Sequence, residues 1–479
     1  MIRNGIYNLI GGILRVLCVV ISTPFLLNTM GLEKYGTWSL ISAIVGILTI
    51  AEAGLSSATT VFIAQDVSEG NDTKLSETIT IVSLTIILLA LTASLILYSG
   101  SEAIISFFPT LNLYEKEVAL KSLRISSLVI FGQLMQQLFI GIEQAFHCYK
   151  LINILSTLQW ILFCFGWCII AFLKFESVEL IAWQLIVTLL FVVIHFYNIR
   201  EILNDRKISL SWDKKRAFEI ANYCSSSWLA TLGGILFTKG DRLIVASLLG
   251  SSYLSIYSVF SDFCGSINYF SAKPIQPLLP IIGSYERGSI PKNELVLKLR
   301  KIFSVNACIS VLLGTFLLLF SKLIVSYLVK SDTNLTYVNG FQYLIVITTL
   351  YSLNSVGYFI LLGLKKVRVF AYINVCSGAM SLLLIYYGAL NYGFMGAILG
   401  NVGFVLTLAF SILSLHYLRI AKENMMYWIV FPVSSFLVSF IISKLITNEI
   451  YSNATLVIEC IAIIVYLFFE FKNKKIQRI

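Results

Sequence analysis

Residues 79–99 read ITIVSLTIILLALTASLILYS, an apolar stretch without a single charged side chain. The hydrocarbon core of a bilayer is about 30 Å thick, so a helix needs about 20 such residues to cross it. Runs of similar length and composition recur along the whole chain, and we expect each of them to be a transmembrane helix. About fourteen are predicted on this length criterion, at 5–28, 37–63, 79–99, 121–143, 151–173, 179–199, 220–249, 253–282, 302–328, 338–363, 368–389, 393–418, 427–446 and 453–470.

The amino-acid composition supports a membrane protein. Of the 479 residues, 58% are hydrophobic and only 13% are charged, whereas a soluble domain carries about 25% charged residues. A larger core cannot explain this shortfall, because a soluble surface still needs groups that water solvates. We therefore predict an all-α, polytopic membrane helix bundle.

The N-terminal run could pass for a signal peptide, because a basic residue precedes an apolar stretch that continues to Leu27. Arg15 interrupts that stretch, however, and no small-residue cleavage site follows it. We expect the segment to remain in the protein as the first membrane helix.

Metal-binding and disulfide chemistry have little support in the sequence. The nine cysteines are scattered through apolar runs, no CxxC pair is present, and the chain has only three histidines. We expect neither a metal site nor a cofactor, and no disulfide framework.

Lysine and arginine residues gather on one side of the predicted bundle. If the N-terminus is cytoplasmic, 23 of them lie on the cytoplasmic side and 8 on the outer side. Short basic loops remain in the cytoplasm during insertion, so we predict that both termini are cytoplasmic. The net charge of +10 then follows from topology, and no nucleic-acid partner is needed to explain it.

The polar connector 200–219 divides the chain. We predict an N-terminal six-helix half at 1–199, a C-terminal six-helix half at 220–418, and an extra helix pair with a basic tail at 419–479. The halves share one short, weak sequence similarity: residues 31–39 and 250–258 both begin with Gly and end with an aromatic residue followed by Ser. Such parallel repeats are typical of transporters.

Polar residues inside the spans are the candidates for function, because an unpaired charge in hydrocarbon costs about 2.5–3.5 kcal/mol. Arg15 shares one face of the first helix with Asn8 and Ser22, about 18 Å from the inner end. Its guanidinium could bind two oxygens of a diphosphate. The alternative is a structural ion pair with Glu52 or Glu143.

The fourth predicted helix carries a stripe of amides that includes Gln133 and Gln137. An amide donates and accepts hydrogen bonds, which suits the hydroxyl groups of a sugar. Amides also form hydrogen bonds between packed helices, so a purely structural role remains open.

The seventh predicted span contains Lys239, Asp241 and Arg242. Three charges in four residues face different directions, so they cannot all reach one cavity. We predict that at least one of them binds substrate or a coupling ion, with Lys239 and Arg242 as substrate ligands and Asp241 as an ion site. A local ion pair between neighbours is the alternative.

The eighth span holds a further carboxylate, Asp262, which is a candidate site for a proton or a sodium ion. Pro274, Pro277 and Pro280 follow it and remove intrahelical hydrogen bonds. They predict either a plain kink or a hinge for alternating access. Glu52, in the second span, is a third candidate for ion coupling.

Several segments resemble one family. Pro24 with MGLEKYGTWSLISAIVGILTIAEAGLSSA (30–58) resembles the opening of polysaccharide flippases of the Wzx type, which belong to the multidrug/oligosaccharidyl-lipid/polysaccharide exporter superfamily. That superfamily also contains MATE drug exporters and the lipid II flippase. Residues 240–260, 273–280 and 393–400 are similar to the matching regions of the C-terminal half.

This resemblance implies the family's activity. Flippases of this type move an undecaprenyl-diphosphate-linked oligosaccharide across the bacterial inner membrane for O-antigen (lipopolysaccharide), capsule or exopolysaccharide synthesis. It implies alternating access driven by a proton or sodium gradient, as in an antiporter, with a polymerase and a chain-length regulator as partners. Cationic side chains line the family's cavity, a role that falls here to Arg15, Lys239 and Arg242. The chain has Glu52 where many relatives have Asp, and the terminal helix pair is extra.

Three alternatives stay open. A MATE-like drug or cation exporter would favour an anionic cavity, which the excess of intramembrane cations disfavours. A membrane-embedded polysaccharide polymerase or ligase would be an enzyme with a large catalytic outer loop, and no such loop is predicted. A scramblase would lack ion coupling. We expect a transporter rather than an enzyme.

The basic asymmetry makes a topological prediction. Residues 200–216 should be accessible only from the cytoplasm, because six of the basic residues lie there. A cysteine placed at residue 207 should therefore remain unlabelled when intact cells are treated with an impermeant thiol reagent. Labelling from outside would reverse the predicted orientation.

Overall fold

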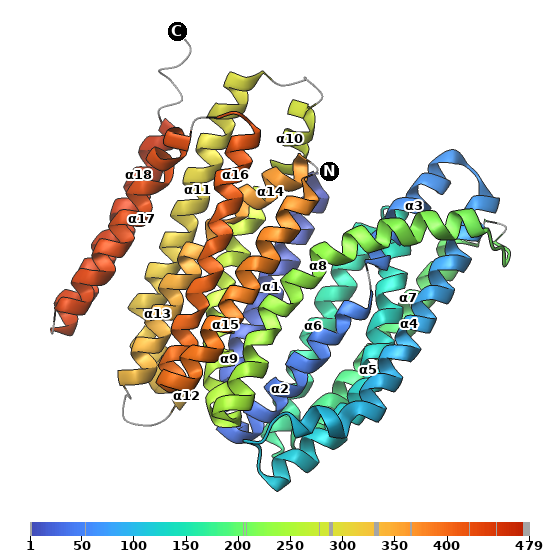
Figure 1. The fold of residues 1–479 in the computed structure, drawn as a ribbon, viewed down its shortest axis with the longest axis horizontal. Helices are drawn as coiled ribbons and strands as arrows, with labels where there is room; N and C mark the ends of the chain where they lie inside the picture. Colours follow the sequence, from blue (N-terminus) through green and yellow to red (C-terminus); the bar gives the residue numbers. More distant parts are fainter. Residues whose placement is uncertain are drawn as a thin grey trace. The chain divides into compact units, whose positions relative to one another are not determined.

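The computed structural model describes residues 2–52, 54–204, 206, 208–276, 278–286, 291–329, 335–364, 366–420, 422–446 and 448–472. Within these ranges the regular structure is entirely helical (Figure 1). The chain folds into two compact units, Met1–Ser258 and Val259–Ile479. The all-α fold class is confirmed.

The first unit is a bundle of long helices. They are α1 (Ile2–Met30), α2 (Leu32–Leu48), the 3₁₀ turn η1 (Thr49–Glu52), α3 (Leu55–Glu69), α4 (Asp72–Ser106), α5 (Leu113–Ala145), α6 (Tyr149–Phe172), α7 (Ser177–Ile202), α8 (Lys214–Leu249) and the first turns of α9 (Ser251–Ala272).

The second unit continues α9 and holds the remaining helices. They are η2 (Lys273–Ile275), α10 (Leu278–Glu286), α11 (Lys292–Leu319), α12 (Ser321–Val329), α13 (Leu335–Ser352), α14 (Ser355–Gly363), α15 (Val367–Gly400), η3 (Asn401–Leu408), α16 (Ala409–Tyr417), α17 (Lys422–Leu445) and α18 (Glu449–Lys472).

The helices are those of a multi-pass membrane protein. Among the described residues, nine helical stretches are long and apolar enough to cross a bilayer, and Leu17–Met30 and Ile429–Leu445 are shorter apolar helices. Helix α4, which contains residues 79–99, shows why. Its inner face is buried (Val82 0%, Leu97 0%), while Leu88 (65%) and Leu95 (66%) of the opposite face are exposed. A helix that is apolar on both faces is stable only against lipid.

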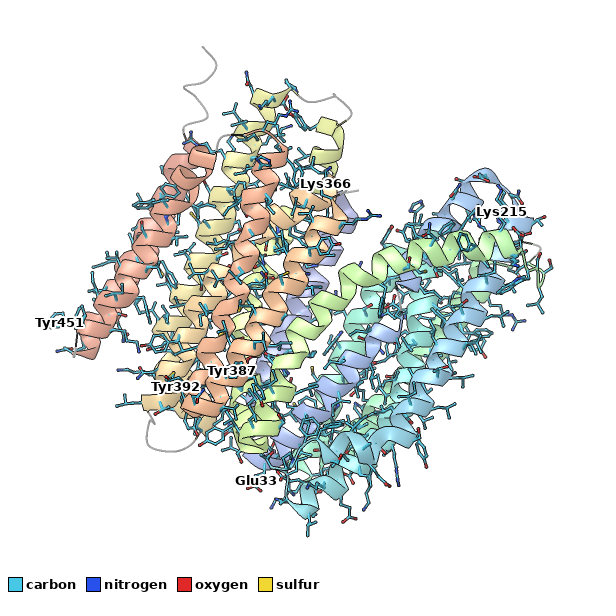
Figure 2. The ribbon with its side chains drawn as sticks, in the orientation of Figure 1. Glu33, Lys215, Lys366, Tyr387, Tyr392 and Tyr451 are labelled. Atoms are coloured by element: carbon cyan, nitrogen blue, oxygen red, sulfur yellow. The ribbon has the colours of Figure 1, made fainter. Side chains whose placement is uncertain are left out.

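The two ends of the helices differ in the side chains that they present (Figure 2). In the first unit Glu33 and Lys215 lie at opposite ends. In the second unit Tyr387 and Tyr392 lie at the end opposite Lys366, and both are exposed. Tyrosine favours the interface between lipid and water, so these residues fit the boundary of a hydrocarbon layer.

Several predicted spans are not single continuous helices. The predicted span 37–63 breaks at η1, where Gly54 adopts φ +73° between η1 and α3. The predicted span 253–282 breaks at η2, beside the prolines. In both cases the sequence correctly predicted a long apolar run. A turn or a proline interrupts the helical hydrogen bonds within it, and hydropathy does not detect such a break.

The two similar segments, 31–39 and 250–258, share one backbone conformation and contact each other. Gly31 (φ +82°, ψ 169°) precedes α2, and Gly250 (φ +91°, ψ 177°) precedes α9. The Ser39 hydroxyl donates a hydrogen bond of 2.6 Å to the hydroxyl of Ser258, its equivalent 219 residues later. A Cβ on Gly36 would lie 1.9 Å from the Ser251 carbonyl oxygen, so only glycine permits this approach of α2 to α9.

Candidate functional site

The charged segment of α8 is packed inside the first unit. Asp241 and Arg242 are only 5% and 7% exposed. The Asp241 carboxylate accepts a hydrogen bond from the Tyr257 hydroxyl of α9 (2.8 Å) and another from the Arg242 backbone N–H (2.8 Å). Lys239 and Arg242 also interact with other groups, and both lie close enough to Asp241 to interact with it electrostatically. The carboxylate is thus held by α8 and α9 together.

The side chain of Lys239 lies against Gly46 of α2. A Cβ on Gly46 would be 3.3 Å from Cε of Lys239. One turn further along the chain, η1 interrupts the second span, and the Trp228 indole of α8 donates a hydrogen bond to the Ile50 carbonyl (3.1 Å). That carbonyl lies in η1, where the α-helical hydrogen bonding of the span ends, and α8 supplies a partner for it.

Glu52 lies in the same break. Its carboxylate accepts a hydrogen bond from the Ser56 backbone N–H (3.1 Å) and so caps the first turn of α3. A carboxylate is favourable at a helix N-terminus, because the free N–H groups and the helix dipole both attract negative charge. Its predicted role in ion coupling stays a prediction.

Arg15 is half-buried on α1. Its Nε donates a hydrogen bond to the Gly11 carbonyl (3.1 Å), and no carboxylate of the described residues lies within ion-pair distance of its guanidinium. Neither of its proposed structural partners contacts it: Glu143 contacts His195 and Glu52 caps α3. Ser22 is buried and donates to the Val19 carbonyl, so that part of the predicted polar face is used in packing.

The amide stripe of α5 divides into two kinds of side chain. Gln136, beside the stripe, exchanges two hydrogen bonds with Gln159 of α6 (2.7 and 3.1 Å), and Gln144 accepts one from Thr60 of α3 (3.1 Å). These two amides join helices. Gln133 is half-buried and Gln137 is exposed, and neither has a hydrogen bond to another described residue. Their predicted role as sugar ligands therefore stays open.

The remaining predicted residues belong to the second unit. Asp262 is half-buried on α9 and takes part in a polar contact. Pro274 is exposed in η2, Pro280 lies in α10, and Pro277 falls outside the described residues. The helix does break between Ala272 and Leu278. Whether the break moves as a hinge stays a prediction.

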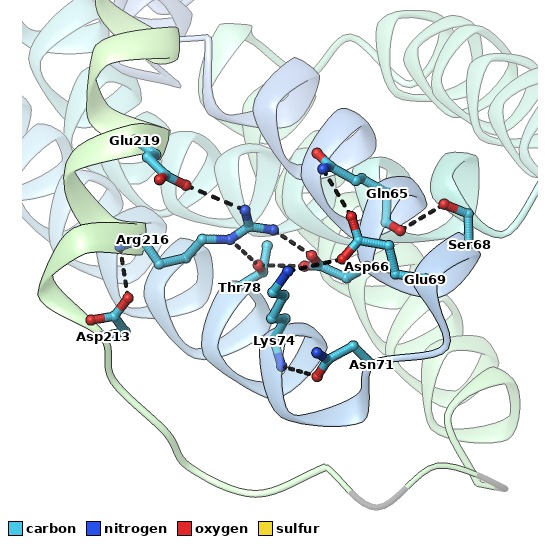
Figure 3. A network of polar contacts seen from close by, with 10 residues as sticks. All are labelled: Gln65, Asp66, Ser68, Glu69, Asn71, Lys74, Thr78, Asp213, Arg216 and Glu219. Atoms are coloured by element: carbon cyan, nitrogen blue, oxygen red, sulfur yellow. Dashed lines mark hydrogen bonds and ion pairs between the residues drawn. The ribbon is translucent and has the colours of Figure 1, made fainter.

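An ion-pair network that the sequence did not reveal lies where the 200–216 connector joins α8 (Figure 3). The Arg216 guanidinium donates to the Asp66 carboxylate of α3 and to the Thr78 hydroxyl of α4 (3.1 Å), and Thr78 donates to Asp66 (2.6 Å). The guanidinium also lies 4.7 Å from the ring centre of Phe62. One arginine thus fixes the start of α8 against α3 and α4.

At the end of the first unit opposite the Arg216 network, Glu176, between α6 and α7, connects these helices to α2 and α5. It accepts hydrogen bonds from Lys34 (2.7 Å) and from Tyr114. Partial burial alone would raise the pKa of Glu176, but these two hydrogen bonds outweigh it and lower the pKa below its ordinary value. This carboxylate is therefore an ionised tie between helices rather than a proton carrier.

The Arg216 network predicts unequal effects of two similar substitutions. Asp66→Asn should destabilise the protein by about 3–5 kcal/mol, because it removes the buried counter-charge of the guanidinium and leaves only a longer ion pair (3.5 Å) with the exposed Glu219. Glu69→Gln breaks the neighbouring exposed pair with Lys74, drawn in the same view, and should leave the unfolding temperature unchanged, since surface pairs contribute little. Thermal unfolding of the purified variants measures both. Equal effects would show that the Arg216 network does not hold α8.

Comparisons with known proteins agree with this architecture. The sequence model of the family described as "Polysaccharide biosynthesis protein" matches residues 1–286, and the model named MatE matches residues 236–387. A Shigella flexneri protein named "Putative O-antigen transporter" is 20% identical over 401 residues, which are 83% of this chain and 93% of that protein.

Two solved structures share the fold. The lipid II flippase MurJ in an inward closed conformation is 15% identical, with a TM-score of 0.72 over 99% of both chains. An inward-facing multidrug resistance MATE transporter is 13% identical, with a TM-score of 0.70 over 88% of this chain and 98% of that chain. At these identities the likeness concerns the fold alone.

Proposed function

The chain belongs to the polysaccharide biosynthesis protein family, and from this we propose that it is a flippase for a lipid-diphosphate-linked oligosaccharide. The substrate would be an undecaprenyl-diphosphate-linked repeat unit for O-antigen or another surface polysaccharide. The protein would lie in the bacterial inner membrane with both termini in the cytoplasm, and would deliver its substrate to a polymerase and a chain-length regulator.

The observation that carries this proposal is the environment of Arg15. Its residue number places it about 20 Å along α1 at 1.5 Å per residue, well inside a bilayer core. A guanidinium at that depth needs a counter-charge, and among the described residues its one hydrogen-bond partner is a backbone carbonyl of its own helix. A diphosphate headgroup supplies two negative charges and oxygens spaced for a bidentate contact.

A drug exporter is the second candidate, favoured by the MatE match over residues 236–387. It would bind a cationic compound and therefore need carboxylates that are free to receive it. In the first unit Asp241 is engaged by Tyr257 and Glu52 caps α3. A bulky organic cation would have to displace these contacts, so they favour the anionic substrate, whereas a proton is small enough to bind Asp241 without displacing them.

The role of Arg15 can be tested in cells that depend on the transporter. Arg15→Ala should reduce export at least roughly tenfold, the equivalent of one lost charge-assisted contact of about 1.4 kcal/mol, with lipid-linked oligosaccharide accumulating in the inner leaflet. Arg15→Lys keeps the charge without the bidentate fork and should lose only part of the export. Arg124→Ala breaks an exposed ion pair with Glu102 and is the matched control, with normal export expected.

A structural role for Arg15 would give a different pattern. Arg15→Ala would then deplete the protein from the membrane, and the loss of export would match the loss of protein.

We place the coupling cation at Asp241 or Asp262, because carboxylates at membrane depth are costly without such a task. Asp241→Asn or Asp262→Asn should abolish the dependence of export on an imposed proton or sodium gradient while the protein still inserts. Asp72→Asn, which changes a carboxylate paired with Arg206 at a helix end, should leave that dependence intact. Normal gradient-dependent export by both Asp241 and Asp262 variants would refute the placement.

A further inference from the structure

Helices α5 and α7 hold a buried pair of titratable side chains. Nδ1 of His195 lies 2.8 Å from Oε1 of Glu143, and both side chains are completely buried. The other polar atom of each, His195 Nε2 and Glu143 Oε2, has no hydrogen-bond partner among the described residues, and neither has Nδ2 of Asn198 one turn further along α7. Buried polar atoms without partners are rare and call for an explanation.

The protons of the pair can be counted. The contact between Nδ1 and Oε1 needs one hydrogen, whichever atom carries it. With that hydrogen alone the pair has a net charge of −1, and both remaining atoms are acceptors. If the lone pair of Nε2 takes one further proton, an N–H bond forms and imidazolium and carboxylate neutralise each other. The pair therefore has a neutral state that differs from its charged state by one proton, and neutrality is what a buried membrane site favours.

Charges on the neighbouring elements do not replace that proton. Cys148, which follows α5, is the titratable side chain that interacts electrostatically with Glu143. Of the other ionisable groups on the elements packed around the pair, Glu52 caps α3, and Asp66, Asp72 and Glu69 are paired with Arg216, Arg206 and Lys74. His147, Lys150, Arg200 and Glu201 are exposed, and Glu77 of α4 is half-buried.

The pair also lies close to a contact between α5 and α3 that could change when the pair binds or releases a proton. Glu143 is two residues before the end of α5, and His195 lies roughly 10 Å before the end of α7, so both are near the end that carries the 200–216 connector. Two residues before Glu143, the Gly141 carbonyl accepts a hydrogen bond from Thr60 of α3 (3.2 Å). A Cβ on Gly141 would lie 3.0 Å from the Ser56 carbonyl oxygen. A shift of α5 would therefore displace the part of α3 that it contacts.

We propose that Glu143 and His195 form a proton-binding site that loads from the connector end of the first unit and whose occupancy is coupled to transport. Binding takes one proton from water and forms the Nε2–H bond of His195, without any redox change. The binding itself is independent of the proposed function, whereas the coupling rests on it. This site is separate from Asp241 and Asp262.

The test uses the small number of histidines, since the chain has only three. The full-length protein is labelled with ¹⁵N-histidine, reconstituted in lipid, and followed by solid-state NMR from pH 5 to pH 9, with His195→Gln assigning the His195 signals. We expect a His195 ring with both nitrogens protonated to appear within this range. In Glu143→Gln the doubly protonated fraction at the same pH should fall at least tenfold, because the neutralising carboxylate is gone. Glu459→Gln changes a buried carboxylate held by Ser435 and Ser439 and should leave it unchanged.

Two results would overturn the proposal. A wild-type His195 that stays singly protonated throughout the range excludes the proton site, and this needs no variant to fold. A titrating His195 combined with normal gradient-dependent export by Glu143→Gln excludes the coupling. Neither result bears on the substrate. The proposed function would be refuted if the wild-type protein did not export the lipid-linked oligosaccharide.

Discussion

One constraint governs this protein: polar groups at bilayer depth must find their partners inside the chain, because lipid offers none. The break at η1 is the plainest case. It frees the Ile50 carbonyl and the first N–H groups of α3, and the indole of Trp228 and the carboxylate of Glu52 engage them. At the connector end of the first unit, Asp66 and Thr78 likewise engage the buried guanidinium of Arg216.

Exceptions to this constraint are where function is most easily located. Among the described residues Arg15 has one hydrogen bond, to its own helix, and the buried Glu143–His195 pair keeps two polar atoms without a partner. The two differ in what would neutralise their charge: a guanidinium needs an anion, whereas the histidine–glutamate pair needs one proton. A flippase driven by a proton gradient would need both kinds of site, one for the headgroup and one for the driving ion.

The sequence predicted the fold well, and the candidate site residues stay predictions. Hydropathy alone located the helices, because apolar runs such as 79–99 have no other stable setting. It could not show the break at η1, which depends on the backbone conformation of Gly54. The pairs Asp66–Arg216 and Glu143–His195 are 150 and 52 residues apart in the chain, and no spacing rule brings such residues together. For the same reason Gln136 and Gln144 could not be told apart from Gln133 and Gln137 before their partners were known. The sequence similarity between residues 31–39 and 250–258 is weak. Gly31 and Gly250 nevertheless both have positive φ, as their shared turn requires.

The central claim is that the protein moves a lipid-linked oligosaccharide and that the diphosphate is what it recognises. Reconstituted proteoliposomes test this most directly. They would carry either a fluorescent undecaprenyl-diphosphate oligosaccharide or the same sugar on a neutral lipid carrier, and a membrane-impermeant quencher would report which leaflet each occupies. We predict that the protein transfers the diphosphate-linked lipid between leaflets and that protein-free vesicles do not, while the neutral lipid stays in place in both. Equal transfer of both lipids, or transfer of neither, would contradict the claim.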